Sequence, residues 1–483
     1  MCKKQKISLI GIGMGNRKSM TIEAEEAVRN CSCMIGAQRM LSAARAVRYG
    51  REIQENSTGE KGQTEQTGYP APSKERTDPA IPELCEYNAE KIFSYIEAHP
   101  EYSHVAVVLS GDTGFYSGAK KLSELFAADP ERYEVEMIPG ISSVVCLAAR
   151  LKTTWEDGAL ISLHGQEENF IQTINRNRKT FLLLGGKDAG KRMVSALKDY
   201  GMDDVTVYIG SRLSYPDEKI VLGRPGELSG SEADGLCAAM ILNPQPDQRT
   251  GPHIPDEEFI RGSVPMTKAE VRAVSLAQME LTEDAVVYDV GAGTGSVSVE
   301  AARSGDRIRV YAVEKKTEAV RLLEENRRKF RADGIRIIEG EAPAALRGLE
   351  PPTHVFIGGS SGNLREILRI VLEKNPSVRI VINAISLETI GEAMDAVGEG
   401  LLKDAQVTQI MASRSRVLGR YHMMTGQNPV YIIAAGGEKT ADGEKSAGGE
   451  LSADGELSVD GAVPEGGELS AEGMPPEERG ALR

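Results

Sequence analysis

The stretch from Val286 to Glu314 constrains the fold more than any other part of the sequence. It reads VVYDVGAGTG, continues as SVSVEAAR, and ends with RVYAVE. An apolar strand leads into a glycine loop, a helical segment follows, and a second strand ends in an acid. This order is typical of a nucleotide-type cofactor site at the carboxyl edge of a parallel sheet. The sequence therefore predicts an α/β fold that holds a cofactor at this edge.

The spacing of the loop narrows the choice of cofactor. Gly291, Gly293 and Gly295 follow a G-x-G-x-G pattern, whereas dinucleotide sites usually read G-x-G-x-x-G. Asp289 leads the loop, and an acid there suits a ligand with an amine and a sulfonium better than a pyrophosphate. S-adenosylmethionine is such a ligand, and Glu314 is predicted to accept its ribose hydroxyls. A glycine turn without a ligand and an NAD-dependent oxidoreductase are the alternatives.

The composition excludes several classes of function. A chain of 483 residues is expected to form more than one domain. Aromatic residues make up only 5% and the net charge is −14, which disfavours a nucleic-acid partner. No apolar run approaches the length of a membrane span. The six cysteines are sparse and suit a reducing compartment, so a cytoplasmic location is predicted.

The titratable residues give no sign of a metal centre. Cys31 and Cys33 form a C-x-C pair, but no Cys or His lies nearby at metal-ligand spacing. The six histidines stand in unrelated contexts. The sequence therefore predicts no metal site, and the catalytic acid or base stays unknown.

The N-terminal part, residues 1–244, is predicted to be one domain built from two subdomains. Up to about Lys152, continuous apolar strands alternate with helices, which implies a parallel sheet with both faces covered. Beyond it the strands are spaced by turns and one helix, which indicates a mixed sheet. The polar stretch 51–80 interrupts the pattern and is predicted to be a mobile surface insertion, with a substrate lid as the alternative.

The rest of the chain divides by composition. Residues 245–258 are rich in proline and are predicted to be a linker, and 259–436 form the next domain. Residues 437–483 repeat hexads such as GELSAD and carry twelve acidic and four basic residues. A disordered acidic tail is predicted there, with a left-handed β-solenoid as the alternative.

Residues 259–435 resemble the decarboxylating, C15-methylating half of the precorrin-6Y C5,15-methyltransferases of cobalamin biosynthesis. The resemblance rests on FIRGSVPMTKAEVRAVSL, YDVGAGTGSVSVEAA, AVE, HVFIGGSSGNL and IVINAISLET. It covers nearly the whole C-terminal domain. It implies a Rossmann-like class I methyltransferase fold that uses S-adenosylmethionine.

Residues 1–244 resemble the tetrapyrrole methylase family, in particular the C5-methylating half of the same fused enzymes. The resemblance rests on IGIGMG, SGDTGFYSGA, IPGISS, SLHGQ and RLSYPDEKIV. The family often has Arg where this chain has Gln166. In this family the loop that contains Gly11, Gly13 and Gly15 faces the substrate trough and does not hold the cofactor.

Together the two halves are similar to a fused enzyme that methylates a precorrin-6 type tetrapyrrole at C5 and C15 and decarboxylates its C12 acetate. The tetrapyrrole is cobalt-bound or metal-free, and related C-terminal domains form homo-oligomers. A methylase acting on another tetrapyrrole or small molecule is the nearest alternative. A non-catalytic scaffold is a further one, disfavoured by the intact glycine loops in both halves.

The loop pattern and the resemblance together predict the site residues. Cofactor contacts in the C-terminal domain are expected at Thr267, Asp289, Gly291, Ala292, Gly293, Thr294, Gly295, Glu314, Glu341 and Ala342. Those in the N-terminal domain are expected at Gly111, Asp112, Ser142 and Ser143. Substrate contacts are expected at Gly13, His164, Lys268, Arg272, Asn383, Arg414 and Arg416, where a solvated charged face is the alternative for each cation.

Overall fold

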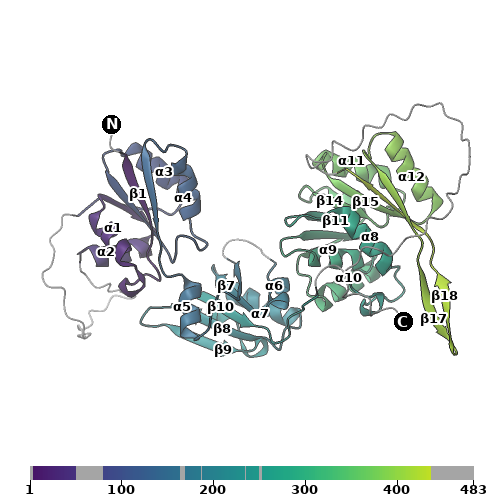
Figure 1. Ribbon diagram of the computed structural model, residues 1–483, viewed down its shortest axis with the longest axis horizontal. Coiled ribbons are helices and arrows are strands. Elements are labelled where there is room, and N and C mark those ends of the chain that lie inside the picture. The colour runs from purple at the N-terminus through teal and green to yellow at the C-terminus, as the bar shows by residue number, and fades with distance from the viewer. Residues whose placement is uncertain are drawn as a thin grey trace, which may run out of the picture. The chain divides into compact units, whose positions relative to one another are not determined.

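In the described residues, three larger β-sheets flanked by helices and one two-stranded sheet make up the fold (Figure 1). The computed structural model describes residues 4–49, 80–163, 169–186, 188–233, 235, 237–249 and 253–436. Residues Met1–Gly437 cluster as one unit. The predicted insertion up to residue 79, His164 and the predicted acidic tail lie outside the described residues. The α/β class predicted from the sequence is confirmed.

The first sheet is entirely parallel and has the order β3-β2-β4-β1-β5. Its strands are β1 (Gln5–Gly11), β2 (Cys33–Gly36), β3 (Glu83–Cys85), β4 (His104–Leu109) and β5 (Tyr133–Ile138). Its helices are α1 (Ile22–Asn30), α2 (Gln38–Tyr49), α3 (Ala89–Ala98) and α4 (Ala119–Ala127). One core packs α1 and α2 against the sheet and a second packs α3 and α4 against it. The continuous apolar strands of the sequence are therefore explained by burial on both faces.

The second sheet is mixed and has the order β6-β7-β10-β8-β9, as predicted beyond Lys152. Only β6 and β7 run parallel. Its strands are β6 (Ala159–Ser162), β7 (Lys179–Leu184), β8 (Thr206–Ser211), β9 (Lys219–Gly223) and β10 (Cys237–Leu242). Helices α6 (Ile171–Arg176) and α7 (Ala189–Asp199) pack on one face, and α5 (Ser143–Arg150) packs on the other. Helix α5 begins where the sequence predicted, because the Ser142 hydroxyl accepts from the Val145 N–H.

The third sheet has seven strands in the order β13-β12-β11-β14-β15-β19-β16. Strands β11 to β15 are parallel neighbours, and β19 runs antiparallel between β15 and β16. The strands are β11 (Val286–Val290), β12 (Arg309–Glu314), β13 (Ile335–Glu339), β14 (His354–Ile357), β15 (Arg379–Ala384), β16 (Gln406–Ile410) and β19 (Val430–Ala435). Strand β11 is buried along its whole length, which explains its unbroken apolar character.

Helices cover both faces of the third sheet (Figure 1). On one face lie α8 (Ala269–Met279), α9 (Ser296–Arg303) and α10 (Thr317–Lys329). On the other lie α11 (Leu364–Lys374) and α12 (Leu387–Gly398). The amphipathic pattern of α11 is typical, since Leu364, Ile367, Leu368 and Val371 are buried. This layering leaves the carboxyl ends of the parallel strands as the open edge.

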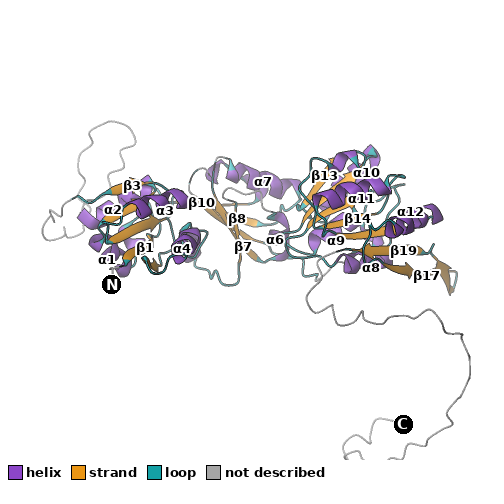
Figure 2. Cartoon of the chain, turned by 90° about the horizontal axis from the view of Figure 1, so that it is seen from above, coloured by secondary structure: helices purple, strands orange, loops and turns teal. Residues whose placement is uncertain are grey.

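A two-stranded hairpin, β17 (Ser413–Leu418) and β18 (Tyr421–Gly426), extends beyond the third sheet (Figure 2). Nearly all of its residues are exposed. Several of them are apolar, with Leu418 at 63% and Met424 at 66% exposure. The hairpin therefore leaves apolar surface uncovered in the single chain.

Candidate functional site

A cavity of about 640 Å³ opens at the carboxyl edge of the seven-stranded sheet. Its walls come from the loops after β11, β12, β13, β14 and β15, and from residues 264–268 ahead of α8. In an open α/β sheet this edge is where ligands bind. The cavity lies where the sequence placed the cofactor.

The glycine loop between β11 and α9 forms one wall of this cavity. Gly291 has φ +75°, and a Cβ there would lie 2.8 Å from the Gly359 carbonyl oxygen. The N–H groups of Gly291 and Ala292 both donate to the Val313 carbonyl, at 3.0 and 3.1 Å. The turn is therefore tight enough to demand glycine and brings bare backbone to the cavity.

Glu314 stands at the tip of β12 and lines the cavity. One carboxylate oxygen accepts from the Gly293 N–H at 2.9 Å, and the other accepts from the N–H groups of Lys315 and Lys316, each at 2.9 Å. A carboxylate has about four lone-pair positions, so these bonds fix it and leave acceptor capacity for a ligand hydroxyl. Glu314 is therefore held in one position at the cavity, and its contact with a ribose stays a prediction.

Other predicted residues share the cavity lining. Those that line it are Thr267, Lys268, Gly291, Ala292, Gly293, Glu314, Glu341, Ala342 and Asn383. Lys315 Nζ pairs with Glu341 at 2.7 Å on the rim. Thus residues spread over more than a hundred positions of sequence meet around one space.

Asn383 brings an unpaired donor to this cavity. Its Oδ1 lies 3.0 Å from Ser275 Oγ on α8, while its Nδ2 is buried and has no hydrogen-bond partner among the described residues. An unpaired buried N–H group costs free energy that a ligand acceptor can recover. The cavity therefore offers a fixed carboxylate acceptor and a wall of glycine backbone, and these fit a nucleoside-bearing ligand with polar ends.

Three predicted cofactor residues lie outside the cavity lining and are corrected. Asp289 is 1% exposed and accepts a hydrogen bond from Ser298 on α9, and burial raises the pKa of its carboxyl to about 6. Thr294 is also 1% exposed, and its carbonyl accepts from Asn326. Gly295 caps α9. These residues support the loop from the side that faces the protein interior. Side chains alternate along a strand, and Asp289 points towards α9.

The predicted substrate role of Arg272 is corrected too, because its side chain is fully buried. Its guanidinium donates to Glu300 at 2.6 Å, to Asp256 at 3.2 Å and to the Thr267 carbonyl at 2.6 Å. It also lies over the Phe259 ring. Arg272 therefore holds the wall that carries Thr267 and has no donor surface to offer a substrate.

The two predicted arginines of β17 lie outside the cavity lining as well. Arg414 forms a two-bond pair with Glu270 at 2.6 and 2.8 Å and contacts Asp256 at 3.1 Å. The hydrogen bonds that Arg414 donates to Glu270 raise the pKa of its guanidinium. Arg416 is exposed on the hairpin. The structure therefore ties Arg414 to the base of the hairpin and does not bring Arg416 to the site.

In the N-terminal half, the predicted residues meet at the carboxyl edge of the first sheet. Gly13 and Gly111 exchange two backbone hydrogen bonds, at 3.0 and 2.8 Å. The Asp112 carboxylate accepts from Gly114 N–H at 2.7 Å and Gly140 N–H at 3.2 Å. Ser142 is buried as the cap of α5, and Ser143 opens that helix.

A second cavity, of about 570 Å³, lies beside these loops. Its lining includes Asn16, Lys18 and Ser19, Ile141 and Val145 on either side of Ser142, and Tyr215 and Glu218. None of the predicted residues is in its lining. The structure thus brings the predicted residues together with each other and next to a cavity, but not into it.

Several cavity residues of the C-terminal half were missed from the sequence. They are Val264, Pro265, Met266, Ser296, Lys315, Lys316, Ser361, Gln427 and Asn428. The VPM segment directly precedes Thr267, and the two lysines directly follow Glu314, so proximity in sequence was an available signal. Gln427 and Asn428 directly follow β18 at the base of the hairpin, and no local pattern marks them.

The described part of the chain contains neither a membrane-spanning helix nor a cluster of metal-binding side chains. No helix there is both long and apolar enough to cross a membrane. No group of three or more His, Cys, Asp or Glu residues is placed to hold a metal ion in the same part.

Comparison with family models gives two matches. The model described as "Precorrin methyltransferase domain" matches residues 258–435. The model described as "Tetrapyrrole (Corrin/Porphyrin) Methylases" matches residues 6–229. The two matches do not overlap and follow the two sequence resemblances.

Curated relatives align with the C-terminal part. A probable cobalt-precorrin-6B C(15)-methyltransferase (decarboxylating) of Pyrobaculum calidifontis is 46% identical over 187 residues, 38% of this chain and 95% of the relative. The cobalt-precorrin-6B C(15)-methyltransferase (decarboxylating) of Salmonella typhimurium is 39% identical, covering 37% of this chain and 93% of the relative.

Solved structures align with each half. The precorrin-6y C5,15-methyltransferase of Geobacter metallireducens is 36% identical, over 38% of this chain and 97% of that one, with a TM-score of 0.36. The precorrin-6Y methylase of Archaeoglobus fulgidus is 18% identical, over 50% of this chain and 99% of that one, with a TM-score of 0.35.

Proposed function

We propose, from the premise that this chain belongs to the precorrin methyltransferase family, that both of its halves act on one precorrin-6 type tetrapyrrole. The chain is an S-adenosylmethionine-dependent C-methyltransferase of cobalamin biosynthesis. Under the proposal the N-terminal half methylates C5. The C-terminal half methylates C15 and removes the carboxyl group of the C12 acetate. Glu314, fixed at the rim of a glycine-lined cavity, is the observation that carries the C-terminal assignment.

The residues present fit S-adenosylmethionine. Glu314 would accept the ribose hydroxyls, and the backbone of Gly291 and Gly293 leaves room for close approach. Glu341 and Ala342, which follow the next strand, would lie along the adenine edge. When bound, this cofactor supplies a methyl group activated by its sulfonium. The chain contributes orientation and exclusion of water, for which no catalytic triad is needed.

The C-terminal cavity also has groups that suit an acidic macrocycle. Lys268, Lys315 and Lys316 line it and carry the positive charge that ring carboxylates require. Loss of carbon dioxide breaks the bond between the acetate carboxyl and its CH₂ group and leaves an electron pair that the conjugated ring can accept. Arg272 is buried and supports the cavity wall through its hydrogen bond to the Thr267 carbonyl. We assign no residue as a general acid or base.

For the N-terminal half we propose cofactor contacts at Gly111, Asp112, Ser142 and Ser143, and substrate contact at Gly13. Asp112 holds the Gly114 and Gly140 backbones, so the cleft edges are set by hydrogen bonds. His164 stays a prediction for the same trough. A cytoplasmic location belongs to the proposal and is supported by the small number of cysteines, six in 483 residues.

We also propose that the C-terminal domain forms a homo-oligomer through the β17–β18 hairpin. Val417, Leu418, Tyr421, Met423 and Met424 are all more than half exposed. A two-stranded hairpin on its own is marginally stable in water, so contact with a second copy would stabilise it. Met424→Glu should give a monomer in light scattering of the full chain, and an unchanged assembly mass would contradict this.

The test is calorimetric titration of the full chain with S-adenosylmethionine, with NAD as the control ligand. Two sites are expected, and NAD should not bind. Glu314→Gln keeps the size of the side chain but loses the charge, so it should abolish or weaken one site by about tenfold or more. Glu325→Gln, on the exposed face of α10, is the matched control and should leave both sites unchanged.

A single site in the wild-type chain would limit methyl transfer to one half. Binding of NAD alone would overturn the proposal. Assays of the same protein with cobalt-loaded and metal-free precorrin-6 type substrates would then decide which form the enzyme takes.

A further inference from the structure

A polar junction joins helix α6 of the second sheet to the third-sheet domain. The carboxylate of Asp333 accepts from the Ile171 and Gln172 N–H groups at 2.7 and 3.1 Å, so it caps α6 from outside. Gln172 is 2% exposed and donates to the Gly305 carbonyl at 3.1 Å and to Asp306 at 3.2 Å. Backbone and side-chain groups of one half are thus satisfied by the other.

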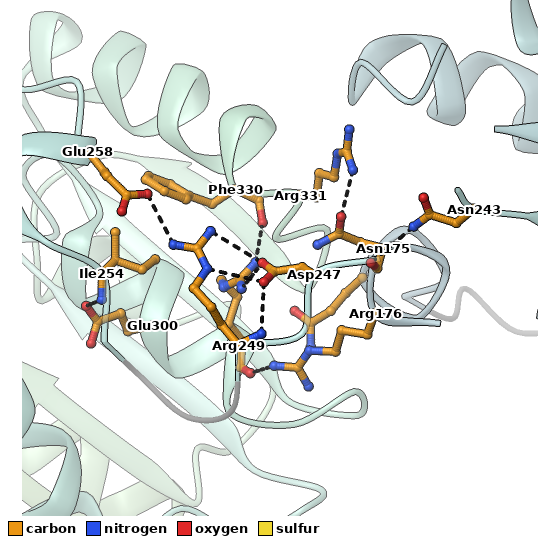
Figure 3. Close-up of polar contacts among 12 residues, drawn as sticks. Asn175, Arg176, Asn243, Asp247, Arg249, Ile254, Glu258, Glu300, Phe330 and Arg331 are labelled. Atoms are coloured by element: carbon orange, nitrogen blue, oxygen red, sulfur yellow. Dashed lines mark hydrogen bonds and ion pairs between the residues drawn. The ribbon is translucent and has the colours of Figure 1, made fainter. Parts of the chain in front are cut away.

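Two arginines add charge-assisted bonds to the same junction (Figure 3). Arg331 donates to Asn175 Oδ1 at 2.7 Å and to the Gly201 carbonyl at 3.1 Å. From the other side, Arg176 pairs with Asp306 at 3.3 Å and contacts the Arg303 carbonyl. Each half therefore contributes an arginine that bonds to the other half. Because the bonds run in both directions, they favour a single orientation of the two halves.

The segment predicted as a linker is fixed at its start (Figure 3). The Asp247 N–H donates to the Asn175 carbonyl at 2.8 Å, and its carboxylate accepts from Arg303 at 2.6 Å. Arg303 in turn donates to the Phe330 carbonyl. Burial acts against the charge of Asp247, but the bonds from Arg249 and Arg303 prevail and lower the pKa of its carboxyl to about 2. The carboxylate is therefore charged and paired at neutral pH.

The junction lies at the edge of the third sheet opposite to the cavity. Gly305 and Asp306 precede β12, and Asp333 precedes β13, so all three stand near the amino ends of these strands. The cavity opens at the carboxyl ends, where Glu314 and Glu341 stand. The contacts therefore leave the cofactor cavity accessible.

We infer that this amino-end surface of the third-sheet domain is a docking surface for the N-terminal half, and that it holds the two halves together without the connecting peptide. A connecting peptide by itself keeps two domains in one molecule. It does not require buried, hydrogen-bonded side chains between them. Here Gln172, Asn175 and Arg303 are all at least nine-tenths buried and are hydrogen-bonded across the junction or along its edge. Such pairs are costly to leave unmade, so separation of the halves is opposed.

The test is made on the full chain with a protease site inserted between Gly251 and Pro252. After cleavage, the two fragments are expected to elute together in gel filtration, at the volume of the uncut protein, at micromolar concentration. Elution as two separate species would overturn the inference. The readout needs neither cofactor nor substrate, so its result is independent of the proposed function.

Variants identify the surface. Asp333→Ala combined with Arg331→Ala removes the cap of α6 and one cation, and the cleaved fragments are then expected to separate. Arg307→Ala is the matched control, because Arg307 is next to Asp306 but pairs with Glu283 and Asp284 of its own domain. Its fragments should stay together. Co-elution of the double variant at the same concentration would contradict the assigned surface.

A variant on the opposite half covers the case in which the double variant fails to fold. Asn175→Ala deletes the acceptor of Arg331 from the N-terminal half. The dissociation constant of the cleaved fragments, measured by analytical ultracentrifugation, should rise by at least about tenfold. An unchanged constant would overturn the role of this contact.

Discussion

The two halves of the chain carry glycine loops of the same spacing that do different things. GIGMG, from Gly11 to Gly15, and GAGTG, from Gly291 to Gly295, both follow the first strand of a parallel sheet. The first glycine of each loop is equally crowded, but a Cβ at Gly13 would lie 2.2 Å from the Ser19 carbonyl oxygen, whereas one at Gly293 would meet its nearest atom at 3.2 Å, so the first loop is the more tightly packed at its centre. The second loop lines a cavity.

The strand that follows each loop explains the difference. Strand β12 ends in Glu314, whose carboxylate reaches back to the Gly293 N–H. Strand β2 ends at Gly36 and offers no acid. Beneath the loops, Leu9 stands where the second half has Asp289, and both are buried. A glycine pattern therefore identifies a tight turn, whereas the acid at the end of the next strand distinguishes the loop for which we propose a ligand site.

The largest expected effect on stability comes from Arg272, which supports the wall of the cavity beside the second glycine loop. Arg272→Met would leave Glu300 buried without its cation and would remove one of the two arginines that pair with Asp256, so the free energy of unfolding should fall by about 3–5 kcal/mol. Urea unfolding measures it. Arg416→Ala, on the exposed hairpin, is the control and should change stability by less than about 0.5 kcal/mol. Similar values for the two variants would contradict the structural role of Arg272.

The next prediction sets the two loops against each other. Gly13→Ala should lower the free energy of unfolding by about 2–4 kcal/mol, because φ is +64° and the Cβ would lie 2.2 Å from the Ser19 carbonyl oxygen. Gly293→Ala meets its nearest atom at 3.2 Å and should cost about 1–2 kcal/mol. In calorimetry, Gly293→Ala should instead reduce affinity for S-adenosylmethionine. If Gly13→Ala and Gly293→Ala lost the same stability, and Gly293→Ala bound S-adenosylmethionine as tightly as the wild type, the distinction between the two loops would be wrong.

A pH dependence is expected from the buried acid under the second loop. Burial raises the pKa of Asp289 to about 6, above about 3.9 in the unfolded chain. The native state therefore holds this proton more tightly, so the group costs stability as pH rises from about 4 to 6. Relative to Asp289→Asn, the wild-type chain should lose roughly 1–3 kcal/mol over this range. Unfolding curves of both proteins between pH 4 and pH 7 test it, and a constant difference would refute the burial argument.

The smallest effect is expected at the acid of the first half. Asp112→Asn keeps one acceptor for the Gly114 and Gly140 N–H groups and gives up the second. The free energy of unfolding should fall by about 0.5–1.5 kcal/mol. A thermal melt of the full chain detects the change, and no change would mean that this carboxylate does not brace the packed loop.

Local patterns in the sequence predicted the sheets and both glycine loops correctly, because each depends on neighbours close in the chain. The ribose contact of Glu314 stays a prediction, and the structure gives its place in the cavity lining. The local patterns failed at Asp289 and Arg272. Asp289 follows an apolar position of β11, and only packing against α9 decides that it faces Ser298. Arg272 is one turn beyond Lys268, yet its partners Asp256 and Glu300 come from other elements. Side-chain partners set by tertiary packing leave no trace in local spacing.

The cavity lining shows the same limit. Glu341 and Ala342 were predicted, since they follow the strand next to Glu314 in the sheet. Gln427 and Asn428 were not, because they reach the cavity only after the chain has passed through the hairpin. The junction at Asp333 was missed for the same reason: its partners at residues 171–172 lie far away in sequence.

Mass spectrometry of the tetrapyrrole product tests the central claim most directly. The full chain, given a precorrin-6 type substrate and S-adenosylmethionine, should yield a product that has gained two methyl groups and lost one carbon dioxide. Glu314→Gln should yield a product with at most one added methyl group. A wild-type product with a single methyl group, or two methyl groups added by the Glu314→Gln protein at the wild-type rate, would contradict the account.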